Sequence, residues 1–254
     1  MSLKSERSGL RGVALATVAG LALMAGAFSL RGLAHAEEPG RRLPEAVMTA
    51  KETARETAKV TAKDAGLRTA TLAGGCFWGV QGVFQHVRGV RQAVSGYAGG
   101  DASDARYSAV STGGTGHAEA VRVTYDPAVI RYDELLRIFF SVALDPTQVD
   151  RQGPDSGPQY RSAIFPDDAE QAAVAKAYIA QLDAAHAYAK PIATRIEPGA
   201  TFYPAEGYHQ DFMASHPHHP YIAANDAPKL RDLQALFPER ATKEPVLVGG
   251  RPPA

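Results

Sequence analysis

A single cysteine, Cys76, is the strongest candidate for chemistry in this 254-residue chain. It lies in the stretch Gly-Gly-Cys-Phe-Trp-Gly at residues 74–79, which also holds the one tryptophan. The residues before it suit a strand, and those after it are apolar at helical spacing: Phe77, Val80, Phe84 and Val87. A thiol at a helix N-terminus meets unpaired N–H groups and the positive end of the helix dipole, so we expect its pKa to be lowered. Because the thiolate is the nucleophilic form, this position predicts a catalytic nucleophile. The alternative is a buried cysteine that acts as a small hydrophobic residue.

The first 36 residues have the three parts of an export signal. Basic residues at 4, 7 and 11 precede an uncharged run at residues 12–30 that is rich in Ala, Leu and Val. Ala-His-Ala at residues 34–36 matches a small-x-small cleavage pattern. We therefore predict an exported, periplasmic protein whose mature chain begins near Glu37. The apolar run approaches the roughly 18–20 residues that cross a bilayer, so an uncleaved membrane anchor is the alternative.

The charge balance argues against a nucleic-acid partner. The chain has 27 basic and 27 acidic residues, and loss of residues 1–36 removes four basic residues and one acidic residue, which leaves a net charge near −3. No basic surface for phosphates is expected from such a composition. An exported chain with one cysteine cannot form an internal disulfide, and a free thiol is a liability in an oxidising compartment. Retention of Cys76 there favours a functional thiol.

Composition divides the chain into four parts. Residues 1–36 are the signal peptide or anchor, and residues 37–66 are a polar spacer with few large apolar side chains and no expected chemistry. Residues 67–238 have the length and composition of one folded domain. Residues 239–254 are rich in Gly and Pro toward their end, and we predict a flexible tail.

Hydrophobic periodicity predicts an α+β domain. Strands are expected at residues 68–73, 90–97, 119–125, 160–165 and 192–196, and helices at residues 77–87, 132–142 and 166–188. The core order is β-α-β-β-α-β with an appended helix and strand, followed by a long C-terminal loop region. This order is that of a ferredoxin-like, two-layer α+β fold.

Polar residues at strand ends and in glycine-rich loops are candidates for partners of Cys76. Glu119 begins the strand after the glycine-rich loop 113–116, and Tyr107 precedes that loop. Asp155 and Tyr160 lie in the Gly/Pro-rich loop before the next strand. Each has an ordinary alternative: a solvated strand end for Glu119, packing for Tyr107, and turn chemistry for Asp155 and Tyr160. The histidines at 216, 218 and 219 lack the cysteine or paired carboxylates of a metal site, so we predict no metal.

Five ordered blocks resemble the methionine sulfoxide reductase A family. They are residues 74–79, 94–100, 115–121, 151–162 and 202–210. A cysteine followed by Phe-Trp would be weak evidence alone, whereas the ordered set covers residues 69–222. The ferredoxin-like fold of the family agrees with the order read from periodicity. Methionine sulfoxide is a reversible lesion that is reduced by separate enzymes for each sulfur epimer.

The resemblance implies a role for each matching residue. Cys76 would attack the sulfoxide sulfur and become a sulfenic acid, while Glu119 would protonate the sulfoxide oxygen. Tyr107 and Tyr160 would donate hydrogen bonds to that oxygen, and Asp155 would line the same site. The aromatic rings of Phe77 and Trp78 would receive the S-methyl group of the substrate. The implied substrates are the S epimer of methionine sulfoxide, free and in oxidised proteins and peptides, and no cofactor is bound.

The sequence departs from the family at three places, one of which is Pro158 before Gln159, where we expect no effect on the chemistry. It lacks the one or two C-terminal cysteines that, in many members, resolve the sulfenic acid, so Cys76 would need an external thiol: a thioredoxin-like protein, a glutaredoxin-like protein or a small thiol. Leu144 stands where a histidine is expected beside Asp145. We predict a monomer that meets a membrane only if the N-terminal segment stays uncleaved.

Two rival functions come from other classes. A cysteine hydrolase or acyltransferase would need a base beside Cys76, with His117 or His209 as candidates, and would accumulate an acyl-enzyme. A non-catalytic binding module would use Phe77 and Trp78 as a docking patch. Such a module would tolerate Cys76→Ser.

Overall fold

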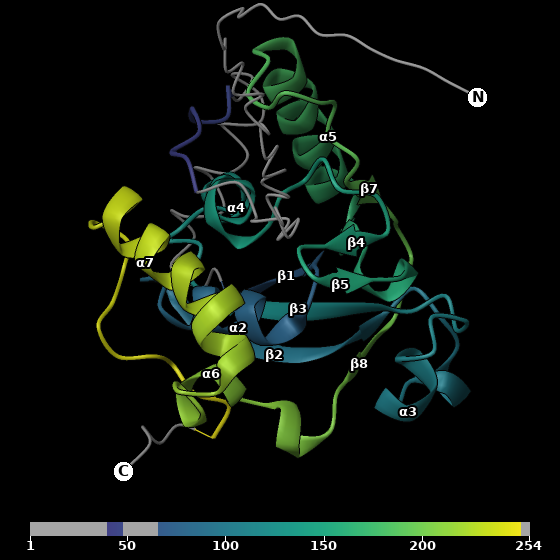
Figure 1. Ribbon diagram of the computed structural model, residues 1–254. Coiled ribbons are helices and arrows are strands. Elements are labelled where there is room, and N and C mark those ends of the chain that lie inside the picture. The colour runs from purple at the N-terminus through teal and green to yellow at the C-terminus, as the bar shows by residue number, and fades with distance from the viewer. Residues whose placement is uncertain (1–39, 48–65, 250–254) are drawn as a thin grey trace, which may run out of the picture. The chain divides into compact units, whose positions relative to one another are not determined.

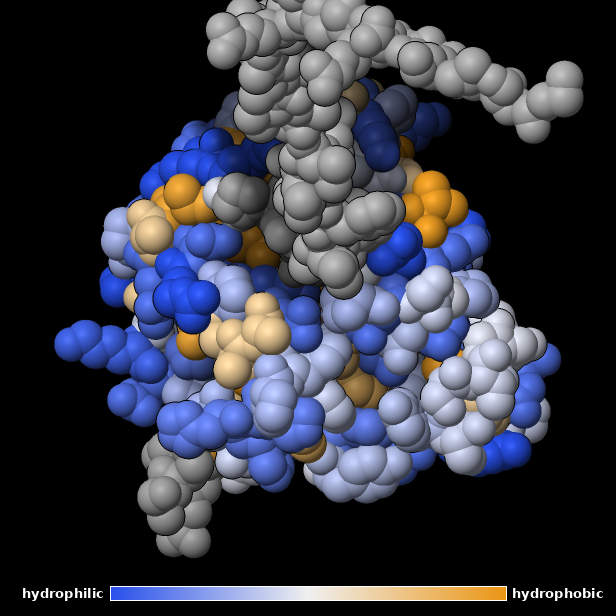
Figure 2. Space-filling model, viewed as in Figure 1, coloured by the Kyte–Doolittle hydropathy of each residue, from blue (hydrophilic) through white to orange (hydrophobic). Residues whose placement is uncertain are grey.

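The computed structural model describes residues 40–47 and 66–249. The predicted signal peptide or anchor and most of the spacer lie outside the described residues. Within the described ranges, no helix is both long and apolar enough to cross a membrane. The face seen in Figure 2 is mostly hydrophilic, with apolar residues scattered over it.

One six-stranded sheet carries the fold, in the order β7-β6-β1-β3-β2-β8. Its strands are β1 (Arg68–Gly74), β2 (Val90–Ala98), β3 (Ala118–Tyr125), β6 (Ser162–Phe165), β7 (Arg195–Ile196) and β8 (Phe202–Pro204). Neighbouring strands are antiparallel except β6 and β7, which are parallel. A small hairpin of β4 (Arg151–Gln152) and β5 (Asp155–Ser156) forms a second sheet. The domain is therefore mixed α/β with a mainly antiparallel sheet.

Helices of very different lengths connect the strands or follow the last of them. The longer ones are α2 (Phe77–Gln85), α4 (Tyr132–Ile138), α5 (Ala169–Ala184) and α7 (Ala227–Leu236). Two π-helical turns, η2 (Phe139–Ala143) and η5 (Ile222–Asp226), extend α4 and precede α7. Short turns complete the set: η1 (Ala102–Asp104), α3 (Tyr107–Val110), η3 (Pro158–Tyr160), η4 (Gly207–His209) and α6 (Phe212–Ser215). Figure 1 shows α2 lying across β1, β3 and β2, with α7 and α6 beside it.

Burial on both faces of the sheet explains its composition. The main core joins α2, α4 and α5 to one face through large side chains such as Leu72, Phe84 and Leu136. The other face is covered by a smaller cluster built largely from alanines, together with Phe165 and Phe202. Because α2 is buried along nearly its whole length, its first turn is held rigidly against the sheet.

Both flanks of the predicted domain contact it. Leu43, from the expected spacer, is 2% exposed and belongs to the main core. Tyr178 of α5 donates a hydrogen bond of 2.7 Å to the carbonyl of Pro44. At the other end, the N–H groups of Thr242 and Val246 donate to the carbonyls of His86 and Gln85 at the end of α2. The described parts of both flanks therefore add to the packing of α2 and α5.

The predicted strands and helices up to residue 196 agree with the structure in order and differ at their ends. The predicted long C-terminal loop region is wrong in part, because it contains α6 and α7, and Leu233 of α7 packs into the main core. The expected long helix at residues 166–188 is α5, which is shorter because Asp168 caps its N-terminus through the N–H of Gln171. The expected helix at 132–142 is present but changes to π-helical geometry after Ile138. Strand β8 was not predicted, because Phe-Tyr-Pro is too short for a periodicity signal.

Candidate active site

Cys76 lies in a tight turn between β1 and α2. The turn depends on Gly75, whose φ of 90° favours glycine, and a Cβ there would lie 2.5 Å from the Cβ of Gln152. Cys76 is the N-cap residue of α2 and is 9% exposed. The thiol therefore stands at the N-terminus of a buried helix, as the sequence predicts.

Glu119 is the second residue of β3 and lies directly beside this turn. The N–H of Phe77, the residue after Cys76, donates a hydrogen bond of 3.1 Å to Oε2 of Glu119. The carboxyl group is only 2% exposed, and burial raises its pKa to about 8 against the smaller opposing effect of that hydrogen bond. Glu119 is thus largely protonated at neutral pH and can donate a proton.

The surroundings of Cys76 favour the neutral form of its thiol. Burial raises its pKa well above the ordinary value, and the carboxylates of Glu119, when ionised, and of Asp226 raise the pKa further. The backbone N–H of Trp78 acts in the opposite sense. The expectation of a lowered pKa is therefore wrong, because the helix N-terminus does not offset burial beside several carboxyl groups.

Tyr107 and Tyr160 approach the same place from different elements. Tyr107 begins α3, and Tyr160 ends η3. Burial, followed by the carboxylate of Glu119, raises the pKa of both phenols, and Cys76 also acts on each. Both tyrosines therefore keep their O–H groups near the thiol and the acid, and can donate hydrogen bonds.

Asp155 reaches the site from the hairpin strand β5. Its carboxylate accepts a hydrogen bond from the hydroxyl of Tyr221. Burial raises the pKa of Asp155, whereas the hydrogen bond from Tyr221 and the charge of Lys229 oppose that shift. The charge of Asp155 is among those that raise the pKa of Cys76, so Asp155 lies near the nucleophile.

Phe77 and Trp78 occupy different depths. Phe77 is 1% exposed, and its ring lies 5.9 Å from that of Tyr97 and 5.0 Å from that of His209. Trp78 is partly buried and stacks on Phe212 at 3.8 Å between ring centroids. Its Nε1–H donates a hydrogen bond of 3.2 Å to Nδ1 of His209. The structure therefore brings all seven predicted site residues together, with Trp78 nearer the surface than Phe77.

The sequence of the chain matches one family of known enzymes. A family model described as peptide methionine sulfoxide reductase matches residues 68–241. The chain belongs to this family. It is 58% identical over 183 residues to the peptide methionine sulfoxide reductase MsrA 2 of Mesorhizobium japonicum, which covers 72% of this chain and 94% of that protein. It is 53% identical over 168 residues to MsrA of Thermus thermophilus, with 66% of this chain and 94% of that protein covered.

Solved structures of reductases give the same family. The reduced form of Mxr1 from Saccharomyces cerevisiae is 35% identical, with a TM-score of 0.55, and the match covers 61% of this chain and 88% of that one. Methionine sulfoxide reductase A of Corynebacterium diphtheriae is 33% identical with a TM-score of 0.52, and covers 61% and 79% respectively.

The two histidines considered as bases for a hydrolase have other partners in this reductase. Nδ1 of His117 accepts the N–H of Gly100, and its Nε2 lies 2.9 Å from the carbonyl of Asp101, so His117 holds the loop after β2. Burial lowers the pKa of His209, whose Nδ1 accepts from Trp78. His209 also packs against Tyr107, at 4.5 Å between ring centroids. His117 and His209 therefore support the walls of the site.

Residues that the sequence analysis did not single out complete the reductase site. Glu206 accepts the N–H of Tyr107 and the hydroxyl of Tyr97, each at 2.8 Å, and so fixes the start of α3. Tyr221, Asp226 and Lys229 reach the site from the C-terminal segment. Glu206 lies in one of the matching blocks, which was a usable signal. Acidic residues and lysines near the start of a helix are ordinarily solvated, so the sequence held no signal that Asp226 and Lys229 belong to the site.

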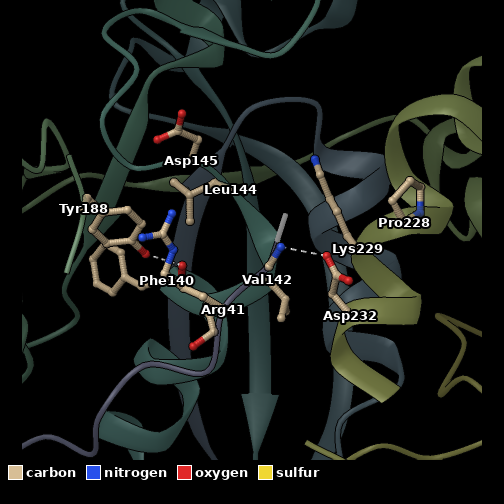
Figure 3. Close-up of a pocket in the computed structure, with 11 residues that line it drawn as sticks. Arg41, Phe140, Val142, Leu144, Asp145, Tyr188, Pro228, Lys229 and Asp232 are labelled. Carbon is tan, nitrogen blue, oxygen red and sulfur yellow. Dashed lines mark hydrogen bonds between the residues drawn. The ribbon is translucent and has the colours of Figure 1, made fainter. Parts of the chain in front are cut away.

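Leu144 packs behind the active-site turn. It is 8% exposed, and a Cβ on Gly74 would lie 3.3 Å from its Cβ, so it contacts the end of β1. It also lines a cavity of about 70 Å³ that Lys229 and Asp232 of α7 enter from the other side (Figure 3). Among the described residues, no group of three or more His, Cys, Asp or Glu side chains could hold a metal ion.

Proposed function

We propose that this enzyme reduces methionine S-sulfoxide, free and in oxidised proteins and peptides, with Cys76 as nucleophile and Glu119 as acid. The observation that carries the proposal is the hydrogen bond between Glu119 and the N–H of Phe77, which holds a protonated carboxyl group beside the thiol. Membership of the reductase family supports the same reaction.

The first half of the reaction transfers oxygen from the substrate to Cys76. The sulfur of Cys76 attacks the sulfoxide sulfur and loses its proton, while Glu119 protonates the sulfoxide oxygen, which is otherwise a poor leaving group. The protonated oxygen then moves from the substrate sulfur to the sulfur of Cys76, so the substrate S–O bond breaks and an S–O bond to Cys76 forms. The bond between the two sulfurs breaks, methionine departs, and Cys76 is left as a sulfenic acid. The proton released by the thiol restores Glu119.

The phenols and aromatic rings orient the sulfoxide for this step. Tyr107 and Tyr160 donate hydrogen bonds to the sulfoxide oxygen, and Asp155 lines the same site. The S-methyl group lies against Trp78 and Phe77, because sulfur-bearing groups pack favourably on aromatic rings. Positioning of this kind lowers the barrier by fixing the reacting atoms before attack.

The second half of the reaction needs thiols from outside the chain. A first thiol condenses with the sulfenic acid to give a mixed disulfide and water, and a second thiol opens that disulfide and regenerates Cys76. The donor is a thioredoxin-like protein, a glutaredoxin-like protein or a small thiol. Cys76 is the only cysteine in the sequence, which supports this requirement.

We further propose a setting for the enzyme. The central strand order β6-β1-β3-β2, with β1, β2, β3 and β6 taken as the four core strands, supports the ferredoxin-like description. The N-terminal pattern supports export to the periplasm with cleavage near residue 36, after which the enzyme acts as a monomer. Repair of oxidised exported proteins is the corresponding role.

A stoichiometric experiment tests the proposed reaction. Purified enzyme is mixed with each sulfur epimer of methionine sulfoxide without added thiol, and methionine is quantified. We expect one methionine per enzyme from the S epimer and none from the R epimer, and many turnovers when dithiothreitol is added. Equal yields from both epimers, or no methionine from either, would refute the proposal. Formation of an acyl-enzyme from an ester substrate would favour the hydrolase instead.

A further inference from the structure

Another cavity, of about 280 Å³, lies at the end of α2 away from the active site, and we call it the distal cavity. Gly82, Gln85 and His86 line one side of it. Cys76 is the N-cap residue of α2 and His86 is the C-cap residue. The nine helical residues between them span about 14 Å, because an α-helix rises about 1.5 Å per residue. The distal cavity is therefore distinct from the site around Cys76.

Apolar side chains from later parts of the chain form the other walls of the distal cavity. They are Met213 of α6, Pro217, Ile222 of η5, Leu230 of α7 and Pro245 of the segment after α7. Figure 1 shows that last segment, in yellow, returning from α7 toward α6. Pro217 is exposed, so the cavity opens to solvent beside it. Among the described residues that line the cavity there is no acid, lysine or arginine, so these walls disfavour a charged ligand.

The ring of His86 offers the cavity a hydrogen-bond acceptor. Its Nδ1 lies 2.7 Å from the carbonyl oxygen of Gly82, which can only accept, so Nδ1 carries the proton. Burial lowers the pKa of His86, against smaller raising effects of that carbonyl and of Glu244, so the ring is neutral at pH 7. Nε2 then holds a lone pair, and it has no hydrogen-bond partner among the described residues. His86 is only 7% exposed, so this acceptor is largely shielded from bulk water.

Gln85 adds a second polar group that lacks a donor. Its Nε2 donates a hydrogen bond of 2.5 Å to Oδ1 of Asp211. Its Oε1 is buried and has no partner among the described residues. The unpartnered polar atoms of Gln85 and His86 are thus both acceptors. Because a buried acceptor without a donor costs free energy, a ligand that carries a donor complements this lining.

The size and chemistry of the walls suit one aromatic ring. Apolar cavities of about 150 Å³ bind benzene, so a cavity of about 280 Å³ admits a ring with a short substituent. The thioether of Met213 packs on the bare backbone of Gly82, where an added Cβ would overlap its Sδ. Sulfur makes favourable contacts with aromatic rings. A ring therefore matches the walls, and a hydroxyl on that ring matches His86.

We infer that the distal cavity binds a small uncharged phenol, whose hydroxyl donates a hydrogen bond to Nε2 of His86. The ring lies among Met213, Ile222 and Leu230. Like the side chain of tyrosine, a simple phenol has a pKa of about 10 and is neutral at pH 7, as these uncharged walls require. This binding site is additional to the site for methionine sulfoxide.

Two matched fluorinated probes test the inference by fluorine NMR. 4-Fluorophenol and fluorobenzene differ only in the hydroxyl group, and each is titrated with the purified enzyme at pH 7. We expect 4-fluorophenol to bind with a dissociation constant on the order of 0.1–1 mM. Fluorobenzene should bind about 3- to 10-fold more weakly, which corresponds to the loss of one hydrogen bond. Equal affinities, or no binding of 4-fluorophenol in the millimolar range, would overturn the inference.

A substitution of His86 tests the hydrogen bond itself. His86→Phe keeps a ring at this position and removes the acceptor, so the two probes should bind with equal affinity. Continued binding of fluorobenzene shows that the cavity is intact in this variant. A preference for 4-fluorophenol that persists in His86→Phe would place the hydroxyl elsewhere and contradict the assignment.

Substitutions that fill the distal cavity test its location. Ala214 of α6 lines the cavity, and Ala214→Leu should abolish binding of both probes. Ala224→Leu is the matched control, because Ala224 is exposed on η5 and is not part of the lining, so both affinities should stay unchanged. If Ala214→Leu does not fold by circular dichroism, Ala227→Leu at the start of α7 fills the same cavity. Unchanged binding in a folded cavity-filling variant would refute the site.

The aromatic site beside Cys76 is the other place where the probes could bind. Saturating methionine S-sulfoxide, added to the Cys76→Ser variant so that no turnover occurs, should leave both probes bound. Displacement of the probes would place them at the active site and overturn the inference. Neither the probe titrations nor the cavity-filling variants require reduction of a sulfoxide, so this inference and the proposed function can fail separately.

Discussion

The N–H of Phe77 and the carboxyl group of Glu119 are joined by a 3.1 Å hydrogen bond between residues 42 positions apart in the chain. Phe77 directly follows Cys76, so the bond couples the acid on β3 to the nucleophile at the start of α2.

Glu119→Gln should slow the first chemical step at pH 7. The amide keeps the shape and can still accept from Phe77, but it has no transferable proton, and general acid catalysis contributes about 10²–10⁴-fold. The measurement is the rate of methionine formation in a single turnover, and the loss should shrink in acid, where solvent protons substitute. Glu239→Gln, which removes an exposed carboxylate paired with Arg42, serves as the control. A rate unchanged at pH 7 would exclude the acid role.

The raised pKa of Glu119 also predicts how stability depends on pH. Because its pKa is about 8 in the folded protein and ordinary in the unfolded chain, folding favours the protonated form. Its contribution to stability is fully present below the unfolded pKa and is lost as pH rises through about 8. Between the ordinary pKa of the unfolded chain and the folded pKa of about 8, the unfolding free energy of the wild type should therefore fall relative to that of Glu119→Gln. The relative change is up to roughly 1.4 kcal/mol per pH unit. Urea titrations at pH 5 and pH 8 measure the difference, and a constant gap would contradict a raised pKa.

Much of the fold and site could be predicted from local sequence. The alternation at residues 119–125 indicates β3, and the apolar spacing after Cys76 indicates α2, because each element buries one face with its own period. Gly74 and Gly75 mark the turn between strand and helix. The blocks that match the reductase family then supplied Glu119 and the tyrosines.

The remaining features depend on long-range packing, which local patterns do not encode. The pKa of Cys76 is raised first by burial, then by Glu119, and then by Asp226, which packs against Gly79 from far along the chain. Nothing in the sequence near Gly79 or Asp226 indicates that contact. Leu43 joins the core from a segment whose composition is that of a spacer. Strand β8 exists because β2 offers it an edge, with Tyr97 paired to Tyr203.

Cys76→Ser should abolish sulfoxide reduction and leave the fold intact. Serine is nearly isosteric, but its hydroxyl is far less acidic and less nucleophilic than a thiol, so we expect below about 1% of wild-type methionine formation. Circular dichroism and thermal unfolding check the fold. Turnover by Cys76→Ser clearly above that level would place the nucleophile elsewhere. A wild-type protein without turnover, together with a Cys76→Ser variant that still binds its ligand, would favour a binding module.

Gly75→Ala should damage both stability and catalysis. The φ of 90° is strained for alanine, and its Cβ would lie 2.5 Å from that of Gln152, so Cys76 must shift. The strain alone costs on the order of 1–3 kcal/mol, and overpacking adds to it. Gly207→Ala is the matched control, because a Cβ there meets nothing within 4 Å and the φ is not positive. Equal thermal stability of the two variants would refute the role of Gly75.

Oxidised enzyme should accumulate as a sulfenic acid when no thiol is present. With one cysteine in the sequence, Cys76 has no internal partner, and an intramolecular disulfide cannot form. Enzyme treated with excess methionine S-sulfoxide should therefore gain the mass of one oxygen at Cys76, and dimedone should trap that species. Added dithiothreitol should remove the adduct-forming species and restore turnover, because its second sulfur completes the exchange. The matched control is Cys76→Ser, which should gain no mass. If the main product were instead a covalent dimer through Cys76, regeneration by an external thiol would no longer explain turnover.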